Sequence, residues 1–336
     1  MKAEGVRYFR PHKPPVAARD QVACFVCGQS FFRRGDTLEA FSLLFNGKIV
    51  ENHVLARCQH CGMVQALLVD EEGLQPPALA DYSEYGDYLV AETEEEIRKR
   101  IDDHAYRWRR MFERLAQRFA RAAVLDFGSG AGYFPQAAAE FGFETFGVEV
   151  SSKMREYSRD RVGFPSVYPS LEALGERQFD AVFAAEVIEH LHPSCSRNLM
   201  TSLLAHLRPG GLFVGSTPNI GSLNVRLFRD KEYVIYPPWH VCYFSTRTLD
   251  HYLRSLGLER DSVTTRELNP LSFLRPSKFE LSFVEKPPKG WEWIVPPVHL
   301  AFRLAGLPVR WCGLGHEIYF AYLKPSRSNA SPARDE

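Results

Sequence analysis

Residues 124–134 read Val-Leu-Asp-Phe-Gly-Ser-Gly-Ala-Gly-Tyr-Phe, an apolar run that ends in an acid and passes into three glycines. The apolar run predicts a buried strand, and Gly128, Gly130 and Gly132 predict a tight turn into a helix. Glycine lets the backbone approach a ligand closely, and the start of a helix presents free N–H groups. The stretch therefore predicts a small-molecule site between a strand and a helix of an α/β fold.

The acid in this stretch narrows the choice of ligand. Asp126 stands two residues before the first glycine, so the spacing is DxGxGxG and not the GxGxxG of dinucleotide sites. A carboxylate there would repel a pyrophosphate, whereas it suits the cationic methionine end of S-adenosylmethionine (SAM). Glu149, 23 residues after Asp126, is expected to end the next strand, where a carboxylate can accept both ribose hydroxyls. The two acids favour SAM, and an NAD-dependent oxidoreductase is the less favoured alternative.

From residue 122 the chain alternates short apolar runs with amphipathic stretches, which is typical of a parallel sheet covered by helices. A preceding helix is expected from near Glu92, because apolar residues recur every three or four positions from Ile97 to Phe119. The many charged residues of this helix are then interpreted as the face that is exposed to water. The expected strands cover 124–127, 143–150, 179–186 and 211–218, with a late edge strand at 316–325, and the expected helices cover 131–141, 152–161 and 195–207.

A second motif occurs twice near the N-terminus. Both copies have the pattern CxxCG, and their cysteines are Cys24, Cys27, Cys58 and Cys61. Four thiolates in a tetrahedron are a preferred structural zinc site, and Asn46-Gly47 between the pairs predicts a hairpin turn flanked by strands at 39–45 and 48–57. The segment predicts a zinc ribbon whose closed metal site is structural. A thioredoxin-like redox pair is less favoured, and His53 and His60 are alternative ligands.

Further segments carry a resemblance to a known family. FDAVFAAEVIEHL (179–191), LRPGG (207–211) and STPN (216–219), together with the glycine loop and Glu149, resemble the SAM-dependent methyltransferases with a seven-stranded Rossmann-like sheet. The similarity is greatest to the branch that includes ubiquinone-biosynthesis and sugar O-methyltransferases. It extends over residues 85–325 and includes PWHVCYF (238–244). An N-terminal CxxCG ribbon also occurs in some bacterial members.

This resemblance implies where the cofactor lies. It implies a loop of Gly128, Ser129, Gly130 and Gly132 under the methionine end, with Asp126 nearby, and Glu149 on the ribose. It also implies adenine contacts near Ser170 and Leu171, and acceptor contacts after the fourth and fifth strands.

Three residues are candidates for the chemistry. Methyl transfer from a sulfonium is an in-line displacement that requires alignment, and a hydroxyl acceptor is helped by a general base. Glu186 is expected at the C-terminal end of the fourth strand, over the cofactor, and is a candidate for both cofactor binding and catalysis. His190 is the first candidate for the base, with a structural histidine as the alternative. His240 follows the fifth strand, in a segment expected to fold over the pocket.

The charge balance bears on the acceptor. The 336 residues include 41 Lys and Arg and 41 Asp and Glu, whereas proteins that bind nucleic acid usually have a basic excess. A small-molecule or glycan acceptor is therefore favoured over nucleic acid, and the resemblance to O-methyltransferases implies oxygen as the methylated atom. An RNA methyltransferase that grips RNA with its ribbon and a SAM-binding scaffold without catalysis are the alternatives. Four tryptophans have two interpretations: they stack on the acceptor, or they pack in the core and at interfaces. They are Trp239, Trp291, Trp293 and Trp311.

The remaining expectations concern location and organisation. The sequence has no run of about 20 apolar residues and no apolar signal segment, so a cytoplasmic protein without membrane insertion is expected. Association into a homo-oligomer is left open. The expected organisation is an extended arm (1–20), a zinc-ribbon module (21–70), a linker and connecting helix (71–121), a methyltransferase domain (122–325) and a disordered tail (326–336).

Overall fold

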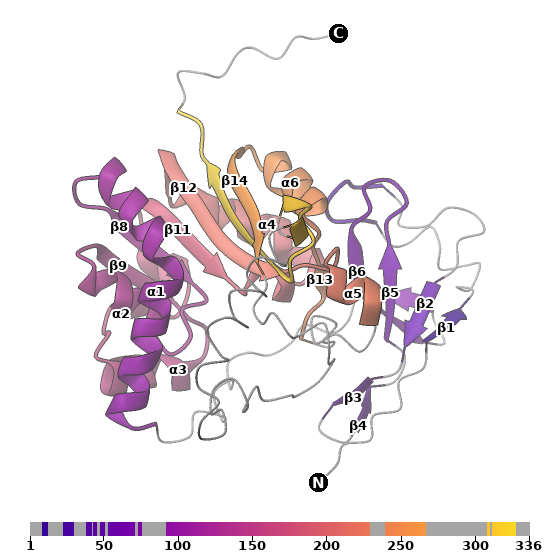
Figure 1. Ribbon diagram of the computed structural model, residues 1–336, viewed down its shortest axis with the longest axis horizontal. Helices are drawn as coiled ribbons and strands as arrows, with labels where there is room; N and C mark the ends of the chain where they lie inside the picture. The colour runs from indigo at the N-terminus through magenta and orange to yellow at the C-terminus, as the bar shows by residue number, and fades with distance from the viewer. Residues whose placement is uncertain are drawn as a thin grey trace, which may run out of the picture.

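A seven-stranded sheet in the order β10-β9-β8-β11-β12-β15-β14 forms the centre of the fold (Figure 1). The first five strands of this order are parallel, and β15 is antiparallel to both of its neighbours. The chain order reverses between β8 and β11, which is where open α/β sheets bind ligands. The bounds are Ala123–Phe127 (β8), Glu144–Val148 (β9), Val167–Tyr168 (β10), Phe179–Ala185 (β11), Leu207–Pro218 (β12), Glu259–Arg266 (β14) and Glu317–Leu323 (β15). The Rossmann-like α/β fold predicted from the sequence is confirmed.

The computed structural model describes part of the chain. It comprises residues 9–12, 23–29, 38–41, 43–45, 48–50, 53–70, 73–75, 92–228, 239–266, 308–309 and 311–326. Trp291 and Trp293 lie outside it, as do most of the predicted arm and tail.

One strand prediction was wrong in its position. The predicted late edge strand is β15, but it lies between β12 and β14, and β14 forms the edge. The run Ile318–Tyr322 is buried on both faces, as suits an inner strand. The sequence of β14, Glu-Arg-Asp-Ser-Val-Thr-Thr-Arg, is largely polar because one side of an edge strand faces water, and it was not predicted as a strand.

Helices cover both faces of the sheet. One core cluster joins the apolar side of α1 to α2 and one face of β8, β11 and β12, and the other joins α4 and α6 to the opposite face. Alternate strand residues therefore belong to different clusters, as with Val182 and Phe183. The helices are Glu94–Arg118 (α1), Tyr133–Glu140 (α2), Ser152–Tyr157 (α3), Pro193–Ala205 (α4), Leu223–Phe228 (α5) and Thr246–Ser255 (α6), with shorter turns at Ser158–Val162 (η2), Glu172–Leu174 (η3) and Ile188–His190 (η4).

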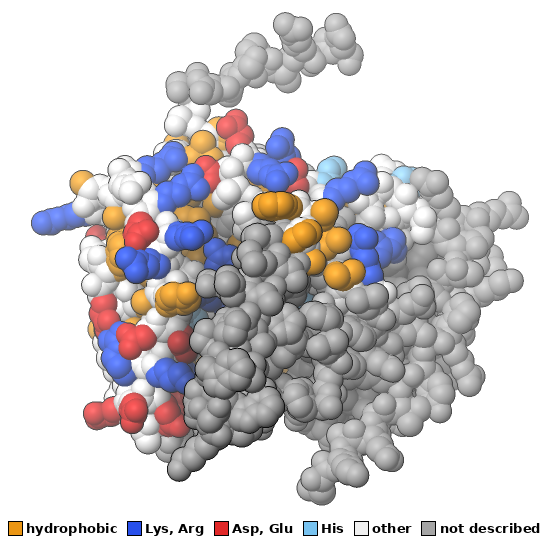
Figure 2. Space-filling view, viewed as in Figure 1, with side chains coloured by type: hydrophobic (Ala, Val, Ile, Leu, Met, Phe, Trp, Pro, Cys, Tyr) orange, Lys and Arg blue, Asp and Glu red, His pale blue; other side chains and the backbone are white. Residues whose placement is uncertain are grey.

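Helix α1 begins where its sequence provides a cap. Thr93 and Glu96 form a capping box, and three glutamates occupy the first turn, where the helix dipole favours negative charge. On its outer side Arg98 pairs with Asp102, and Figure 2 shows acidic and basic side chains interspersed over this part of the surface. The charge run of the helix is thus its solvated side.

A second sheet brings the N-terminal segment against the larger domain. Its order is β1-β2-β5-β6-β13, with β7 also paired to β6. Strand β13 comes from far along the chain, after β12, so the sheet is shared between the two parts of the protein. The bounds are Phe9–His12 (β1), Leu38–Phe41 (β2), His53–Arg57 (β5), Val64–Asp70 (β6), Gly73–Gln75 (β7) and Cys242–Tyr243 (β13).

A separate hairpin of Leu43–Phe45 (β3) and Lys48–Val50 (β4) pairs Phe45 with Lys48, which leaves the two residues Asn46-Gly47 as the connection. The hairpin prediction is confirmed, although each predicted flanking strand is divided in two. No helix in the described ranges is both long and apolar enough to cross a membrane.

Candidate active site

The glycine loop between β8 and α2 is closed tightly against its neighbours. Gly128 has φ 77° and Gly132 has φ 85°, both in the left-handed region that favours glycine. A Cβ atom on Gly128 would lie 2.6 Å from the Val187 side chain, and one on Gly132 would lie 2.2 Å from the Ser158 hydroxyl. The loop therefore requires glycine at both positions.

Glu149 braces this loop from the end of the neighbouring strand. One carboxylate oxygen accepts the N–H of Gly130 at 2.8 Å, and the other accepts the N–H of Ser151 at 2.8 Å. The N–H of Glu149 donates to the carbonyl of Tyr168 at the end of β10, and Leu171 is buried just beyond. Glu149 and the segment around Leu171 thus lie at the carboxyl ends of adjacent strands.

A cavity of about 260 Å³ opens beside the loop. Asp126 lines it and is fully buried, and burial together with the charge of Glu149 raises the pKa of Asp126 to about 8. A cation placed in the cavity would stabilise the ionised carboxylate. The lining is Glu92, Arg100, His104, Asp126, Gly128, Ser129, Gly130, Ala131, Tyr133, Phe134 and Ala185.

The predicted site residues did not include Glu92, Arg100 or His104, which lie in α1 or just before it. The carboxylate of Glu92 accepts hydrogen bonds from Tyr133, Tyr157 and Arg100, which ties the start of α1 to α2 and α3. A signal was present for His104, because it shares the apolar face of α1 with residues such as Ile101 and Trp108. A histidine on a buried helix face is a candidate for a site.

A second group of polar side chains follows β11 directly after the cavity wall. Glu186 has φ 55°, a left-handed conformation, and its carboxylate accepts the hydroxyl of Ser216 at 2.7 Å. Glu189 accepts the hydroxyl of Thr217 at 3.0 Å, while its other oxygen has no hydrogen-bond partner in the described part of the chain. The fold thus places buried carboxylate oxygens, which can accept hydrogen bonds, at the carboxyl end of β11.

The two predicted histidines meet at this group. The rings of His190 and His240 are 4.8 Å apart in an edge-to-face arrangement, and side-chain atoms of Glu189, His190 and His240 lie within 4.8 Å of one another. Nδ1 of His190 is 2.9 Å from the carbonyl oxygen of Trp239 and must donate to it, so in the neutral ring Nε2 carries the lone pair. The structure thus brings two of the three candidate catalytic residues, His190 and His240, next to each other, and their catalytic roles stay predictions.

The charges around this group are set by burial. Burial, with a smaller contribution from His240, lowers the pKa of His190 to about 4, so its imidazole is neutral at pH 7. Burial raises the pKa of Glu186 well above its usual range and that of Glu189 to about 8. Arg107 from α1 brings a positive charge nearby, where it pairs with Glu317 and donates to Ser216.

Replacing Glu189 with glutamine is expected to stabilise the fold in alkaline solution. The folded pKa of about 8 lies above the ordinary value of 4.5, so the folded state keeps a proton that the unfolded chain loses, and stability falls as the pH rises from about 4.5 to 8. Glu189→Gln removes this loss, which makes the variant about 1–3 kcal/mol more stable than wild type at pH 8.5 and about equal near pH 5. Urea denaturation at both values measures it, with the exposed Glu176→Gln as control. An equal difference at both pH values would contradict the assignment.

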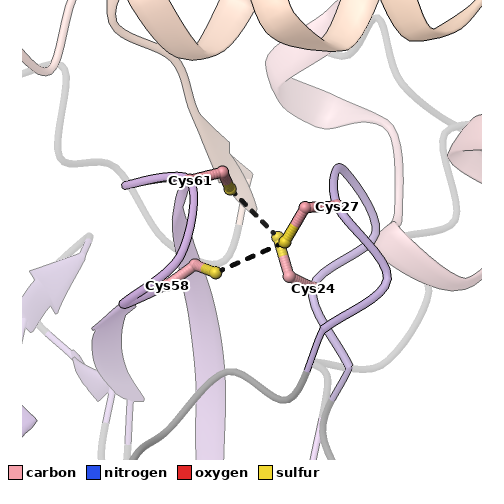
Figure 3. A group of neighbouring side chains, drawn as sticks. All are labelled: Cys24, Cys27, Cys58 and Cys61. Atoms are coloured by element: carbon pink, nitrogen blue, oxygen red, sulfur yellow. Dashed lines mark hydrogen bonds between the residues drawn. The ribbon is translucent and has the colours of Figure 1, made fainter.

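The four predicted cysteine ligands converge on one point (Figure 3). Two sulfur pairs, Cys24 with Cys61 and Cys27 with Cys58, are 3.6 Å apart. Thiolates about 2.3 Å from a tetrahedral zinc ion stand about 3.8 Å apart, whereas a disulfide requires about 2.05 Å. Backbone N–H groups of the two turns point at the sulfurs of Cys24 and Cys58. Donor type, spacing and orientation therefore fit zinc.

The comparisons with known proteins agree with this geometry. Residues 98–263 match a family model described as a methyltransferase domain. The chain is 34% identical over 113 residues to a ubiquinone biosynthesis O-methyltransferase of Paramagnetospirillum magneticum, covering 32% of this chain and 45% of that protein. It is 30% identical over 118 residues to a probable S-adenosylmethionine-dependent methyltransferase of Mycolicibacterium smegmatis, covering 32% and 43%.

The chain thus spans less than half the length of these curated relatives. Among solved structures, a SAM-dependent methyltransferase from Archaeoglobus fulgidus aligns with a TM-score of 0.45 at 20% identity, over 69% of this chain and 97% of that one.

Proposed function

Because residues 98–263 constitute a methyltransferase domain, we propose that this protein transfers the methyl group of SAM to an oxygen atom of a small-molecule or glycan acceptor. One observation carries the proposal. The glycine loop, braced by Glu149, borders a cavity lined by the buried Asp126, and a buried neutral histidine follows the adjacent strand β11. The name of the O-methyltransferase relative supports oxygen as the target.

The cofactor is assigned to the carboxyl ends of β8, β9 and β10. Asp126 would lie beside the methionine end, where the positive charge of the bound cofactor would favour the ionised carboxylate. Glu149 accepts the ribose hydroxyls, and Ser170 and Leu171 contact the adenine. The complete proposed set is Asp126, Gly128, Ser129, Gly130, Gly132, Glu149, Ser170, Leu171 and Glu186.

The acceptor is assigned to the group after β11. Nε2 of His190 would take the proton from the acceptor hydroxyl, and bound SAM would supply the methyl group for in-line transfer to that oxygen, with S-adenosylhomocysteine as the other product. His240 and Glu186 align the acceptor from either side.

Binding and transfer assays test this function directly. Calorimetric titration with SAM, S-adenosylhomocysteine (SAH) and NAD is expected to show binding of the two adenosyl compounds and none of NAD. Transfer of labelled methyl to a panel of phenols, sugars, amines and RNA then identifies the acceptor class. Failure of SAM and SAH to bind the folded protein would overturn the proposal, and binding without transfer to any class would favour a scaffold.

We also propose that the four cysteines hold one structural zinc ion. Replacing Cys24 and Cys27 together with serine is expected to reduce the zinc content from about one ion per chain to nearly none, because two of four ligands are lost. The thermal midpoint should fall by about 10 °C or more, since metal binding contributes directly to folding. Elemental analysis and calorimetry measure both, with the exposed Cys312→Ser as control. Full metal content in the double variant would disprove the assignment.

A further inference from the structure

Strand β6 connects the second cysteine pair to the segment that carries His240. Cys61 and Gly62 lead through Met63 into β6, which pairs with β13 by matching Val64 to Tyr243 and Gln65 to Cys242. The N–H of Ala66 donates to the carbonyl of Val241 at 2.9 Å. The strand that leaves the cysteine turn therefore holds the residues immediately after His240.

The other side of the same segment is bonded to the candidate acceptor site. The N–H of Val241 donates to the carbonyl of Glu189 at 2.9 Å, and the thiol of Cys242 donates to the carbonyl of Leu191 at 3.2 Å. Residue 241 thus accepts from β6 with its carbonyl and donates to η4 with its N–H. It links the cysteine module, defined as residues 23–29 and 53–70, to the turn that carries Glu189 and His190.

Side chains of the first cysteine turn fix the same connection. The ring of Phe25 contacts Tyr252 at 5.3 Å and Phe244 at 6.4 Å, both edge-to-face. Cys24 and Cys58 belong to the same buried cluster as Val241, Cys242 and Phe244, so the metal-ligand turns pack directly on the β13 segment. A module joined to the larger domain only by a linker would make none of these contacts, so the cysteine module is packed against that domain.

The cofactor side is built from other elements. The glycine loop follows β8, and Glu149 follows β9, and neither strand pairs with β6 or β13. The cavity lining also comes from α1, α2 and the end of β11. Disturbing β6 should therefore move the acceptor side and leave the cofactor side in place.

We propose that the metal-loaded cysteine module is the positioning element of the acceptor site, with β6 holding His240 against His190 and Glu189. This inference rests on the proposed function, because that function identifies the group as the acceptor site. The placement of His240 by β6 does not depend on it. Metal loading then controls acceptor geometry without controlling SAM binding.

The test removes one hydrogen bond and leaves all four cysteines in place. Ala66→Pro lacks the N–H that donates to Val241, whereas Ala66→Val adds similar bulk and keeps it. With labelled histidine, NMR signals of the His190 and His240 rings are expected to move in Ala66→Pro and to stay near the wild-type positions in Ala66→Val. Zinc content stays at one ion per chain, and SAH affinity stays within about threefold of wild type.

A second arm covers the case in which the proline variant fails to fold. Zinc is stripped from the wild type with a thiol-reactive mercurial and a chelator, then restored under reducing conditions. The two imidazole signals are expected to shift on removal and return on reloading, with SAH affinity unchanged within about threefold.

Unmoved imidazole signals in stripped protein, or SAH binding lost together with the signals, would overturn the positioning role. Absence of SAH binding in the wild type would instead overturn the proposed function. The NMR signals of His190 and His240 would still test whether the cysteine module positions His240.

Discussion

Replacing Glu149 with alanine is expected to weaken SAH binding by about 100-fold or more. The carboxylate makes two hydrogen bonds of 2.8 Å to backbone N–H groups, one of them on the glycine loop. A hydrogen bond to a charged group contributes about 1.5–3 kcal/mol, and a factor of ten in affinity corresponds to about 1.4 kcal/mol. The alanine variant loses the brace of Gly130 and the acceptor for the ribose together.

Two further variants make the measurement specific. Glu144 begins β9, the strand that Glu149 follows, and its side chain is exposed, so Glu144→Ala should bind SAH like the wild type. Glu149→Gln keeps one acceptor oxygen and should fall between wild type and alanine, with a loss of about tenfold. Calorimetric titration gives all four affinities. If Glu149→Ala binds SAH within about threefold of wild type, the cofactor does not lie on this carboxylate.

The shape of the glycine loop, to which we assign the cofactor, could be predicted from the sequence because its geometry is local. Gly128 and Gly132 have positive φ because the strand turns directly into a helix. Glycine adopts this conformation most readily, so the requirement is visible in the sequence. Glu149 ends the next strand, so the spacing from Asp126 already implied that the two acids face one site. Both follow from short stretches of chain.

The polar group after β11, to which we assign the acceptor, depends on contacts between distant residues, and the sequence predicted only part of its composition. The motif after β11 indicated Glu186 and His190, but the pairing of Arg107 with Glu317 joins residues 210 positions apart and has no local pattern. Strand β13 has two residues, too few for a period of alternation, and becomes a strand only because β6 lies beside it. The prediction of a separate ribbon could not include this shared sheet.

Replacing His190 with alanine is expected to reduce kcat by about 10²–10⁴-fold on a hydroxyl acceptor, the range for loss of a general base. SAH affinity should stay within about threefold, because His190 does not line the cofactor cavity. The exposed His251→Ala is the matched control. Rates with the acceptor found in the methyl-transfer panel, at saturating SAM, measure the effect.

The pH dependence separates a base from a merely structural histidine. With its pKa lowered to about 4, His190 stays neutral as the pH falls through 6.5, so kcat should persist to about pH 5 and decline only below it. Protonation removes the lone pair on Nε2, which fixes the sign of the decline. An unchanged rate in His190→Ala would contradict the assignment of His190 as the general base.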